Sequence, residues 1–457
     1  MSNFELTEKI RKKLLKCRVS VLGIGYVGLP LAIEFAKRKK CIITNFLMQR
    51  KVVGFDINQQ RVYELNNGFD STKEIRNEDF NDLKLIKFTT QEEDLYDSDV
   101  FIITVPTPIN NNKKPDLNAL LKASKIVGKA IKNRKTANND NLEKPLIIFE
   151  STVYPGVTEE ICIPIIEEES ISKLNKNFYC GYSPERINPG DSKYKLINIK
   201  KVTSGSCDQA RLLVDFLYAS IIDAGTFSVD NIKIAEAAKV IENTQRDLNI
   251  ALVNELSLIF RKLNIDTLKV LEAAETKWNF MSFRPGLVGG HCIGVDPYYL
   301  TYKAQEMGYY PEVVLAGRKI NDAMSTWIAN EVVDQLKKNK TFLKESKVLF
   351  LGVTFKENCP DTRNSKSIEI INQLELNGIK VTIVDPLANI DDFKKEFKKE
   401  ITHDVPGDCD YDAYIVAVSH DKFLDPNFIN WREIGNKNKI IFDIKGILPI
   451  NLNAIRL

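Results

Sequence analysis

Short apolar runs alternate with helical segments through the first half of the chain, and no other feature limits the possible fold as strongly. Each run is nearly continuous in Val, Ile, Leu and Phe, as expected for strands buried on both faces of a sheet. The runs are RVSVLGIG (18–25), KVVGFDI (51–57), DVFIITVP (99–106), PLIIFEST (145–152) and FYCGYS (178–183). Helical stretches such as LPLAIEFAKRKK lie between several of them. This order predicts βαβ units and a parallel sheet.

The last third of the chain repeats this pattern. SKVLFLGV (346–353), KVTIVDP (380–386) and YDAYIVAVS (411–419) follow one another in the order, and at similar spacings, of the first three runs. We therefore expect a second doubly wound domain. Only Gly352 stands where the first copy has three glycines, so we do not expect the second copy to hold a dinucleotide in the same way.

A long stretch without Gly or Pro, from Thr226 to Arg284, separates the two patterns. Asp230 or Asn231 can cap a helix there, and apolar residues recur at helical spacing as far as Leu263. A helix of about 31 residues, at ~1.5 Å per residue, is about 46 Å long, which suits a connection between domains and a dimer interface. The expected fold is α/β, with two doubly wound (Rossmann-like) domains joined by this long central helix.

The overall charge and the cysteines argue against several classes of protein. The 64 basic and 61 acidic side chains leave a formal charge of +3, which is too small to drive nucleic-acid binding. We see no apolar stretch long enough for a signal peptide or a membrane span, so we expect a cytoplasmic protein without a membrane partner. The eight cysteines contain no CxxC pair and only three histidines are present, which argues against disulfides and a bound metal. A cysteine that matters should therefore act singly, as a nucleophile.

Gly23, Gly25 and Gly28 form a GxGxxG motif directly between a predicted strand and a predicted helix. Gly23 permits the tight turn, Gly25 lets a pyrophosphate approach the backbone, and Gly28 lets the helix pack on the strand. The helix N-terminus then faces the phosphates with its amides. Asp56 ends the next strand, where it can accept hydrogen bonds from the adenosine ribose and disfavour a 2′-phosphate. The motif therefore predicts NAD as the cofactor.

The position of Asp56 is irregular in one respect. It follows Gly28 by 28 residues, whereas about 20 are usual. We interpret the segment CIITNFLMQR (41–50) as an insertion between helix and strand, because VVGFDI is the only plausible second strand. Arg61 follows, and it either stacks near the adenine or lies on a helix surface.

Three further segments carry residues suited to catalysis. Lys239 and Asn243 lie one helical turn apart on one face of the long helix, where they can polarise a substrate oxygen and stabilise developing negative charge. The segment FRPGLVGGHCIGVDPYYL (283–300) presents Cys292 in a glycine-rich turn, which leaves room for a substrate. The third segment, residues 355–363, follows the first strand of the second copy.

Across essentially its whole length, the chain resembles the nucleotide-sugar 6-dehydrogenases, the family of UDP-glucose, UDP-N-acetylhexosamine and GDP-mannose dehydrogenases. The motifs that carry the resemblance occur in the family's order: GIGYVGLPLA, VPTP, ESTVYPG, SPERINPG, the Lys239/Asn243 helix, GGHCIGVDP and FKENCPDTR. The resemblance implies oxidation of a CH2OH group to a carboxylate, a four-electron reaction that uses two NAD in succession. A cysteine holds the aldehyde as a thiohemiacetal and then as a thioester, so that the aldehyde cannot escape.

The resemblance also implies roles for individual residues. The expected catalytic residues are the nucleophile Cys292, Lys239 and Asn243 at the oxyanion, Asp296 near the cysteine, and Thr152 and Glu185 around the catalytic water. The expected cofactor contacts are Gly23, Gly25, Tyr26, Val27, Gly28, Asp56, Arg61, Val105, Pro106, Thr107, Thr152 and Arg363. The expected substrate contacts are Glu185, Arg186, Lys239, Asn243, Phe283, Arg284, Gly286, Gly289, Phe355, Lys356 and Lys445. His291 precedes the nucleophile, but neighbouring loop residues often point apart, so we do not assign it as the base.

Two departures from the family pattern narrow the substrate. UDP-glucose dehydrogenases carry a second acid four residues after the one that matches Glu185, where this chain has Pro189. They also tend to carry Lys before the acid that matches Asp296, where this chain has Val295. Both features resemble the branch that acts on UDP-N-acetylhexosamines, with the gluco or galacto epimer as substrate, for polysaccharide precursor synthesis. UDP-glucose and UDP-N-acetylmannosamine stay alternatives.

Two other classes of protein fit parts of the sequence. A β-hydroxyacid dehydrogenase shares the dinucleotide domain and a Lys-x-x-x-Asn helix, but it needs no cysteine and normally lacks a second α/β domain. A non-catalytic dinucleotide-binding sensor would have lost catalytic residues that are intact here.

The resemblance and the long helix together suggest a homodimer, in which Arg284 completes the neighbouring subunit's sugar site. We expect three regions: an NAD-binding domain (1–225), a central helical dimerisation region (226–325) and a UDP-sugar-binding domain (326–457).

Overall fold

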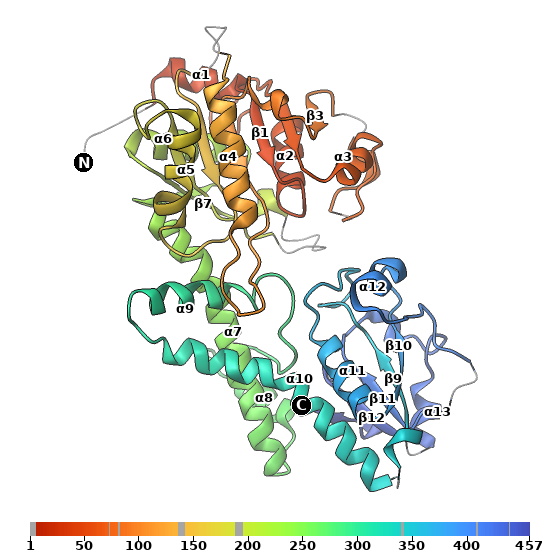
Figure 1. Ribbon diagram of the computed structural model, residues 1–457. Helices are drawn as coiled ribbons and strands as arrows, with labels where there is room; N and C mark the ends of the chain where they lie inside the picture. Colours follow the sequence, from red (N-terminus) through yellow and green to blue (C-terminus); the bar gives the residue numbers. More distant parts are fainter. Residues whose placement is uncertain are drawn as a thin grey trace. The chain divides into compact units, whose positions relative to one another are not determined.

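The computed structural model describes residues 6–72, 74–80, 83–135, 142–187, 195–339, 342–407, 410–437 and 439–457 (Figure 1). The chain forms two units. The first comprises Met1–Glu242 with Tyr298–Glu306, and the second comprises Asn243–Pro297 with Met307–Leu457. Each unit is built around one sheet.

The sheet of the first unit has eight strands in the order β3-β2-β1-β4-β5-β6-β7-β8. Neighbouring strands are parallel except β6 and β7, which are antiparallel. The strands are β1 (Val19–Leu22), β2 (Val52–Phe55), β3 (Ile86–Thr89), β4 (Val100–Ile103), β5 (Leu146–Phe149), β6 (Tyr179–Tyr182), β7 (Lys201–Gly205) and β8 (Thr226–Ser228). All four residues of β1, β4 and β5 are buried, as the continuous apolar runs predict for central parallel strands.

Helices cover this sheet. Among them, α2 packs on β1 and β2, and α6 packs on β6 and β7 (Figure 1). The helices of this unit are α1 (Glu8–Lys16), α2 (Gly28–Lys37), α3 (Gln59–Asn66), α4 (Asn118–Lys132), α5 (Ile163–Ser170), α6 (Asp208–Ala219) and most of α9 (Asp296–Glu306). A π-helical turn, Thr158–Cys162, leads into α5.

The 41–50 insertion lies between α2 and β2 as expected. It folds back on itself, since Leu47 forms an antiparallel bridge with Lys40, the residue before the segment. Arg50 anchors the segment: its fully buried guanidinium donates to the Leu14 carbonyl at 2.9 Å and to Ser220 Oγ at 3.0 Å. The insertion therefore leaves β2 in its expected position beside β1.

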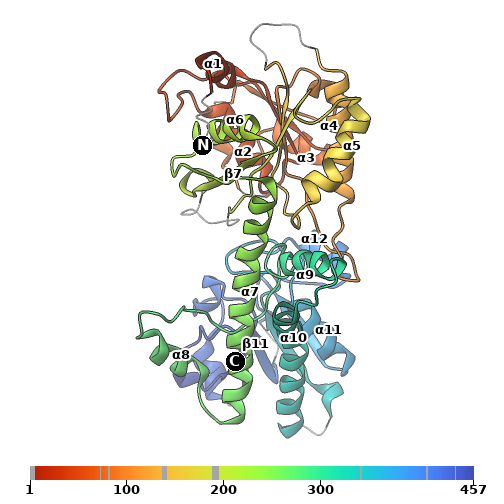
Figure 2. The same cartoon turned by 90° about the vertical axis from the view of Figure 1, so that its left-hand side faces the viewer.

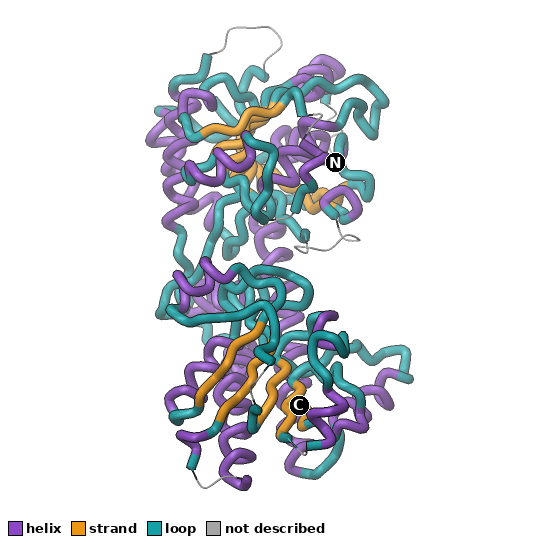
Figure 3. The backbone as a smooth tube through the Cα atoms, turned by 90° about the vertical axis from the view of Figure 1, so that its right-hand side faces the viewer, coloured by secondary structure: helices purple, strands orange, loops and turns teal. Residues whose placement is uncertain are grey.

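The second unit contains a parallel sheet of five strands in the order β10-β9-β11-β12-β13, drawn in orange side by side in Figure 3. The strands are β9 (Lys347–Leu351), β10 (Lys380–Val384), β11 (Ala413–Val416), β12 (Ile440–Asp443) and β13 (Ile455–Arg456). Its helices are α8 (Thr267–Glu275), α10 (Glu312–Asn339), α11 (Ser367–Leu376), α12 (Ile390–Phe397) and α13 (Trp431–Asn436). Apolar residues of α10 and α11 pack against β9 and β11 in the core of this unit.

The long helix α7 (Ile232–Lys262) has 31 residues without interruption (Figure 2). Its predicted cap is present, because the Asn231 side chain accepts from the Ile234 N–H at 2.9 Å. The helix ends before Asn264, whose φ of +56° is left-handed, and α8 then starts behind a new cap from Asp266. No helix in the described part of the chain is both long and apolar enough to cross a membrane.

Candidate active site

The glycine-rich turn after β1 has the geometry of a phosphate-binding loop. Gly23 has a φ of +90°, and its N–H donates to the Phe55 carbonyl at 2.8 Å. A Cβ on Gly28 would lie 2.0 Å from the carbonyl oxygen of Gly23, so this position takes no side chain. A Cβ on Gly25 would meet no atom within 4 Å, which leaves open space beside the backbone. α2 then starts without a side-chain cap, so its first N–H groups suit a pyrophosphate.

Asp56 lies at the end of β2, beside this turn. Its carboxylate accepts from the N–H groups of Ile24 at 3.0 Å and Asn58 at 2.9 Å, which holds it where the ribose of a dinucleotide is expected. The surface alternative for Arg61 is wrong, because its buried guanidinium donates to the Ile24 carbonyl at 3.0 Å and pairs with Asp70 at 2.7 Å. Its contact with the adenine stays a prediction.

The ends of β4 and β5 are tied together by two hydrogen bonds. Ser151 Oγ donates to the Val105 carbonyl and Thr107 Oγ1 donates to the Thr152 carbonyl, each at 2.7 Å. Pro106 between them is exposed. The structure therefore brings together the expected cofactor residues of VPTP and the expected Thr152 at one edge of the sheet.

Glu185 follows β6 and joins two other expected residues. Its main-chain carbonyl accepts from the buried Lys239 ammonium at 2.8 Å, and its Oε1 accepts from the Arg186 N–H at 2.5 Å. The Arg186 guanidinium pairs with Glu242 and donates to the Lys239 carbonyl at 3.3 Å. Pro189 lies outside the described residues.

Glu185 also belongs to a buried charged cluster that no local sequence pattern marks. Lys201 Nζ lies 2.8 Å from Glu150 Oε2 and 2.5 Å from Glu185 Oε2. The Tyr218 hydroxyl donates to the other oxygen of Glu150. Burial raises the pKa of Glu150. Burial alone would lower the pKa of Lys201, but Glu150 and Glu185 raise it above its usual value. Lys201 is therefore an ammonium.

Cys292 is exposed in the turn that precedes α9. Its carbonyl accepts from the N–H groups of Val295 at 3.0 Å and Asp296 at 2.8 Å, which fixes the turn. The buried Asp296 carboxylate accepts from Asn243 Nδ2 at 2.5 Å. Asn243 is one helical turn along α7 from Lys239.

The contact that His291 makes does not support a role as the catalytic base, because its ring is paired with Asp361. Its Nε2 lies 3.2 Å from Asp361, which also accepts from the Arg363 guanidinium at 2.7 Å. Although burial opposes the effect, His291 and Arg363 hold the pKa of Asp361 well below its usual value. His291 therefore ties the cysteine turn to the loop after β9, and the contact of Arg363 with the cofactor stays a prediction.

The loop expected over the sugar is held by an asparagine that the sequence analysis missed. The Asn254 side chain accepts from the Gly286 N–H at 2.8 Å and donates to the Gly286 carbonyl at 3.0 Å. A Cβ on Gly289 would lie 2.7 Å from the Asn364 carbonyl oxygen, so the loop packs tightly there. Arg284 is exposed and pairs with Glu275.

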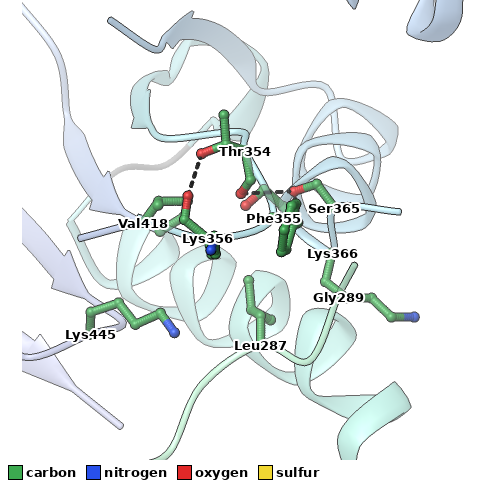
Figure 4. Close-up of a pocket in the computed structure, with 11 residues that line it drawn as sticks. Leu287, Gly289, Thr354, Phe355, Lys356, Ser365, Lys366, Val418 and Lys445 are labelled. Carbon is green, nitrogen blue, oxygen red and sulfur yellow. Dashed lines mark hydrogen bonds between the residues drawn. The ribbon is translucent and has the colours of Figure 1, made fainter. Parts of the chain in front are cut away.

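Two expected lysines line a pocket of the second unit, with Leu287, Gly289 and Phe355 (Figure 4). Lys445 extends from the end of β12 toward Lys356, whereas Lys366 points away and pairs with Glu369 at 2.6 Å. No carboxylate of the described residues forms an ion pair with Lys445, whose pKa is lowered by burial. The pocket therefore suits an anionic group.

Tyr26 and Val27 lie partly exposed at the start of α2, and Phe283 is partly exposed beside Arg284. Nothing in the structure tests these three contacts, which stay predictions. Within the described residues, no group of three or more His, Cys, Asp or Glu is arranged to hold a metal ion.

Models of one protein family match most of the chain in three consecutive parts. They are the NAD binding domain over residues 17–222, the central domain over 233–323 and the UDP binding domain over 349–450 of the UDP-glucose/GDP-mannose dehydrogenase family. The chain belongs to this family. It is an NAD-dependent dehydrogenase of nucleotide sugars, and its turn of Gly23, Gly25 and Gly28 with Asp56 fits that cofactor.

Individual relatives support this assignment over the full length. The dehydrogenase is 48% identical over 440 residues to UDP-N-acetyl-D-glucosamine 6-dehydrogenase of Salmonella typhi, covering 96% of this chain and 98% of the relative. It is equally identical over 441 residues to the enzyme of that name from Pseudomonas aeruginosa, covering 96% and 99%. The solved UDP-D-ManNAc dehydrogenase of Pyrococcus horikoshii matches with a TM-score of 0.80 at 30% identity, covering 94% of this chain and 96% of that one. The predicted fold class is confirmed.

Proposed function

We propose that this dehydrogenase oxidises the C6 alcohol of UDP-N-acetylglucosamine to the carboxylate. The identity of 48% to two UDP-N-acetyl-D-glucosamine 6-dehydrogenases carries this choice. Relatives named UDP-N-acetyl-D-mannosamine dehydrogenase are only 30–32% identical. Val295 before Asp296 supports the same branch.

The exposed thiol of Cys292 is the group that can hold the substrate covalently. Its sulfur adds to the C6 aldehyde and gives a thiohemiacetal, which after a second oxidation becomes a thioester. NAD, held by the turn of Gly23, Gly25 and Gly28 with Asp56, would supply the hydride acceptor for each of the two oxidations. Water then releases the acid from Cys292. We assign Glu185 and Thr152 to this water.

Lys239 and Asn243 are assigned to the substrate oxygen. Lys239 is buried, and a buried ammonium interacts with a developing oxyanion more strongly than one in water. The amide of Asn243 is oriented by Asp296 at 2.5 Å. Together these groups stabilise the negative charge that forms when the thiolate attacks and when the water attacks.

UDP, the nucleotide part of the substrate, is assigned to the second unit. The UDP binding domain matches residues 349–450, and the pocket with Lys356 and Lys445 lies in this stretch and the 287–289 loop. The two ammonium groups there suit the diphosphate. Phe355, Gly286 and Gly289 shape the same surface.

Initial rates of NADH formation with a panel of nucleotide sugars test the proposal. We expect two NADH per UDP-N-acetylglucosamine consumed, and a lower kcat/KM with UDP-N-acetylgalactosamine, UDP-N-acetylmannosamine, UDP-glucose and GDP-mannose. A clearly higher kcat/KM with UDP-glucose would overturn the substrate. A yield of one NADH per sugar would overturn the four-electron reaction.

The homodimer, the cytoplasmic location and the three-region division stay part of this proposal. Along α7, large apolar side chains are exposed at positions spaced by near multiples of a helical turn: Ile234, Ile241, Leu252 and Ile259. Leu263, directly after the helix, continues this spacing and is also exposed. Such a stripe on one helix face is typical of an interface.

A further inference from the structure

Glu185 is held between two lysines that act on different parts of it. The Lys239 ammonium binds its main-chain carbonyl at 2.8 Å, whereas the Lys201 ammonium binds its Oε2 at 2.5 Å. Its Oε1 takes the Arg186 N–H at 2.5 Å. These contacts orient the Glu185 side chain. Because a carboxylate oxygen can accept more than one hydrogen bond, Glu185 can still accept a hydrogen bond from a further donor.

Lys201 is buried and pairs with both carboxylates of this cluster. Its side chain is 2% exposed, and those of Glu150 and Glu185 are 0% and 5% exposed. The Lys201 ammonium also lies over the Tyr218 ring, with Nζ 5.1 Å from the ring centre. Lys201 lies on β7 and Tyr218 on α6, whereas Glu150 follows β5 and Glu185 follows β6. The tertiary fold therefore brings the four side chains together.

The charges in the cluster explain why a lysine stands here. Two buried carboxylates this close to one ammonium would repel each other and take up a proton if that ammonium were absent. Burial raises the pKa of Glu150, and the Tyr218 hydroxyl also donates to it. The Lys201 ammonium therefore offsets the repulsion between the two carboxylates that it binds.

We propose that Lys201 is a positioning residue for hydrolysis of the thioester: its ammonium binds the Glu185 carboxylate and orients it to accept a proton from the attacking water. The inference rests on the proposed function, which assigns Glu185 to that water. In this step the water oxygen bonds to the thioester carbon, the C–S bond breaks, and sulfur leaves as the Cys292 thiolate. One water proton passes to Glu185 and then to solvent, the second is released when the new carboxylic acid ionises, and no electrons are transferred.

Lys201→Met in the full chain, followed with NAD and UDP-N-acetylglucosamine, is the direct test. We expect the first two NADH per active site to form at rates within about threefold of the wild type. We expect the steady-state rate that follows to fall by about 10- to 100-fold, the scale of a lost acid–base contribution, with the thioester accumulating on Cys292 in intact-protein mass spectra. The acid limb of the kcat–pH profile should move to higher pH, while the KM of the sugar should change little.

A double variant separates this role from simple charge neutralisation. Glu150→Gln with Lys201→Met removes one carboxylate and the ammonium, so the cluster keeps its net charge and should fold even where Lys201→Met does not. We expect it to hydrolyse the thioester as slowly as Lys201→Met. A wild-type steady-state rate in the double variant would overturn the proposal, because Lys201 would then only neutralise Glu150.

Lys144 supplies a matched control in the same unit. Its ammonium also lies 5.1 Å from a tyrosine ring, that of Tyr179, but within the described residues its one hydrogen bond is to the Asn175 carbonyl, at 3.2 Å. Lys144→Met should therefore keep wild-type kinetics. If the wild type forms no thioester, the proposed function fails; if it does, and both Lys201 variants hydrolyse it normally, only the role of Lys201 fails.

Discussion

A cysteine serves as a nucleophile when substrate can reach it, and this condition singles out Cys292. It is exposed and Cys207 is partly exposed, whereas the other described cysteines are buried. Burial raises the pKa of the Cys17 thiol to about 11 and that of Cys162 to about 12, so these thiols are inert at neutral pH.

Cys292→Ala is therefore expected to keep its affinity for NAD and UDP-sugar, because neither expected site uses the thiol for binding. Formation of the acid should fall by a factor on the order of 10³ or more, as for other lost nucleophiles. Product acid and NADH measured together provide the readout. Cys207→Ser should retain activity, and a near wild-type yield of acid from Cys292→Ala would exclude the covalent mechanism.

Glu236 on α7 is a second residue with a defined electrostatic role. Its buried carboxylate accepts from the N–H groups of Gly156 at 2.6 Å and Thr158 at 3.0 Å, and so caps the turn that leads into α5. Burial raises its pKa from 4.5 to about 7 against these bonds.

A carboxyl whose pKa is higher in the folded state stabilises the fold below its unfolded pKa and loses this contribution as pH rises through the folded value. The wild type should therefore lose up to about 3 kcal/mol between about pH 4.5 and 7, whereas Glu236→Gln should not. Urea unfolding of both proteins at pH 5 and pH 8 measures the difference. A stability difference that stays constant or grows with pH would show that Glu236 is ionised in the cap.

At the scale of elements, the two sheets use the same turn for different purposes. Gly23 and Gly352 have φ values of +90° and +94°, and their N–H groups donate to the last residues of β2 and β10 at 2.8 and 2.9 Å. The acid that follows β10, Asp385, has no exposed surface, since His420 and the N–H groups of Val353, Thr354, Leu387 and Ala388 surround it. Asp56 in the first sheet stays partly exposed. The second sheet is therefore unsuited to the ribose contact that the first one offers.

His420 also positions the loop that carries Lys356. Its Nδ1 accepts from the Asn358 N–H at 2.9 Å, so the ring proton is on Nε2 and is donated toward Asp385 and Thr354. Thr354 in turn donates to the Lys356 carbonyl at 2.9 Å. The imidazole thus contacts Thr354 at one end of the loop and Asn358 at the other.

His420→Ala is expected to raise the Kd of UDP about 10-fold, the effect of roughly 1.4 kcal/mol lost from a buried hydrogen-bond network. The Kd of NAD should not change, because the expected NAD site lies in the first unit. Calorimetric titration with each ligand measures both. His403→Ala is the control, since in the described part of the chain that ring hydrogen-bonds to the Ala388 carbonyl alone. Equal effects of the two variants would contradict the role of His420.

Sequence patterns located the elements whose burial is continuous and missed those whose burial is partial. β1, β2, β4, β5 and β6 were expected from their apolar runs, whereas β7 (KVTSG) begins with a lysine that no periodicity marks as buried. β3 and β8 are the two edge strands of this sheet and are partly polar. Lys201 becomes buried only because Glu150 and Glu185 meet it, and such long-range partners have no signal in local spacing.

The expected site residues divide along the same line. Glycines and terminal acids such as Gly23 and Asp56 follow from the geometry of a strand–turn–helix unit, so their positions could be derived. Asn254 and His420 act through partners 32 to 66 positions away. Glu150 ends an apolar strand, as Asp56 does, and that signal could have marked it.

At the scale of the whole molecule, the exposed apolar stripe of α7 calls for a partner. Leu252, Ile259 and Leu263 are 55%, 45% and 60% exposed. Their spacings of seven and four residues place them on one side of the helix. A second copy of the chain would bury each of these residues on both subunits, because a two-fold interface uses the same surface of each subunit.

Leu252→Glu should therefore convert the dimer to a monomer. Each buried leucine contributes roughly 1.5–3 kcal/mol, and the substitution removes two while bringing two carboxylates toward each other, so the dimer Kd should rise by a factor on the order of 10² or more. Light scattering should give the mass of one 52.0 kDa chain for the variant and twice that mass for the wild type. Leu376→Glu changes a leucine of α11 that is 79% exposed and should leave the dimer intact. If Arg284 completes the neighbouring sugar site, the Leu252→Glu monomer should also lose activity. For the same reason, a mixture of the inactive Arg284→Ala and Cys292→Ala variants should recover part of the wild-type activity. A fully active monomer would contradict both the dimer and the shared site.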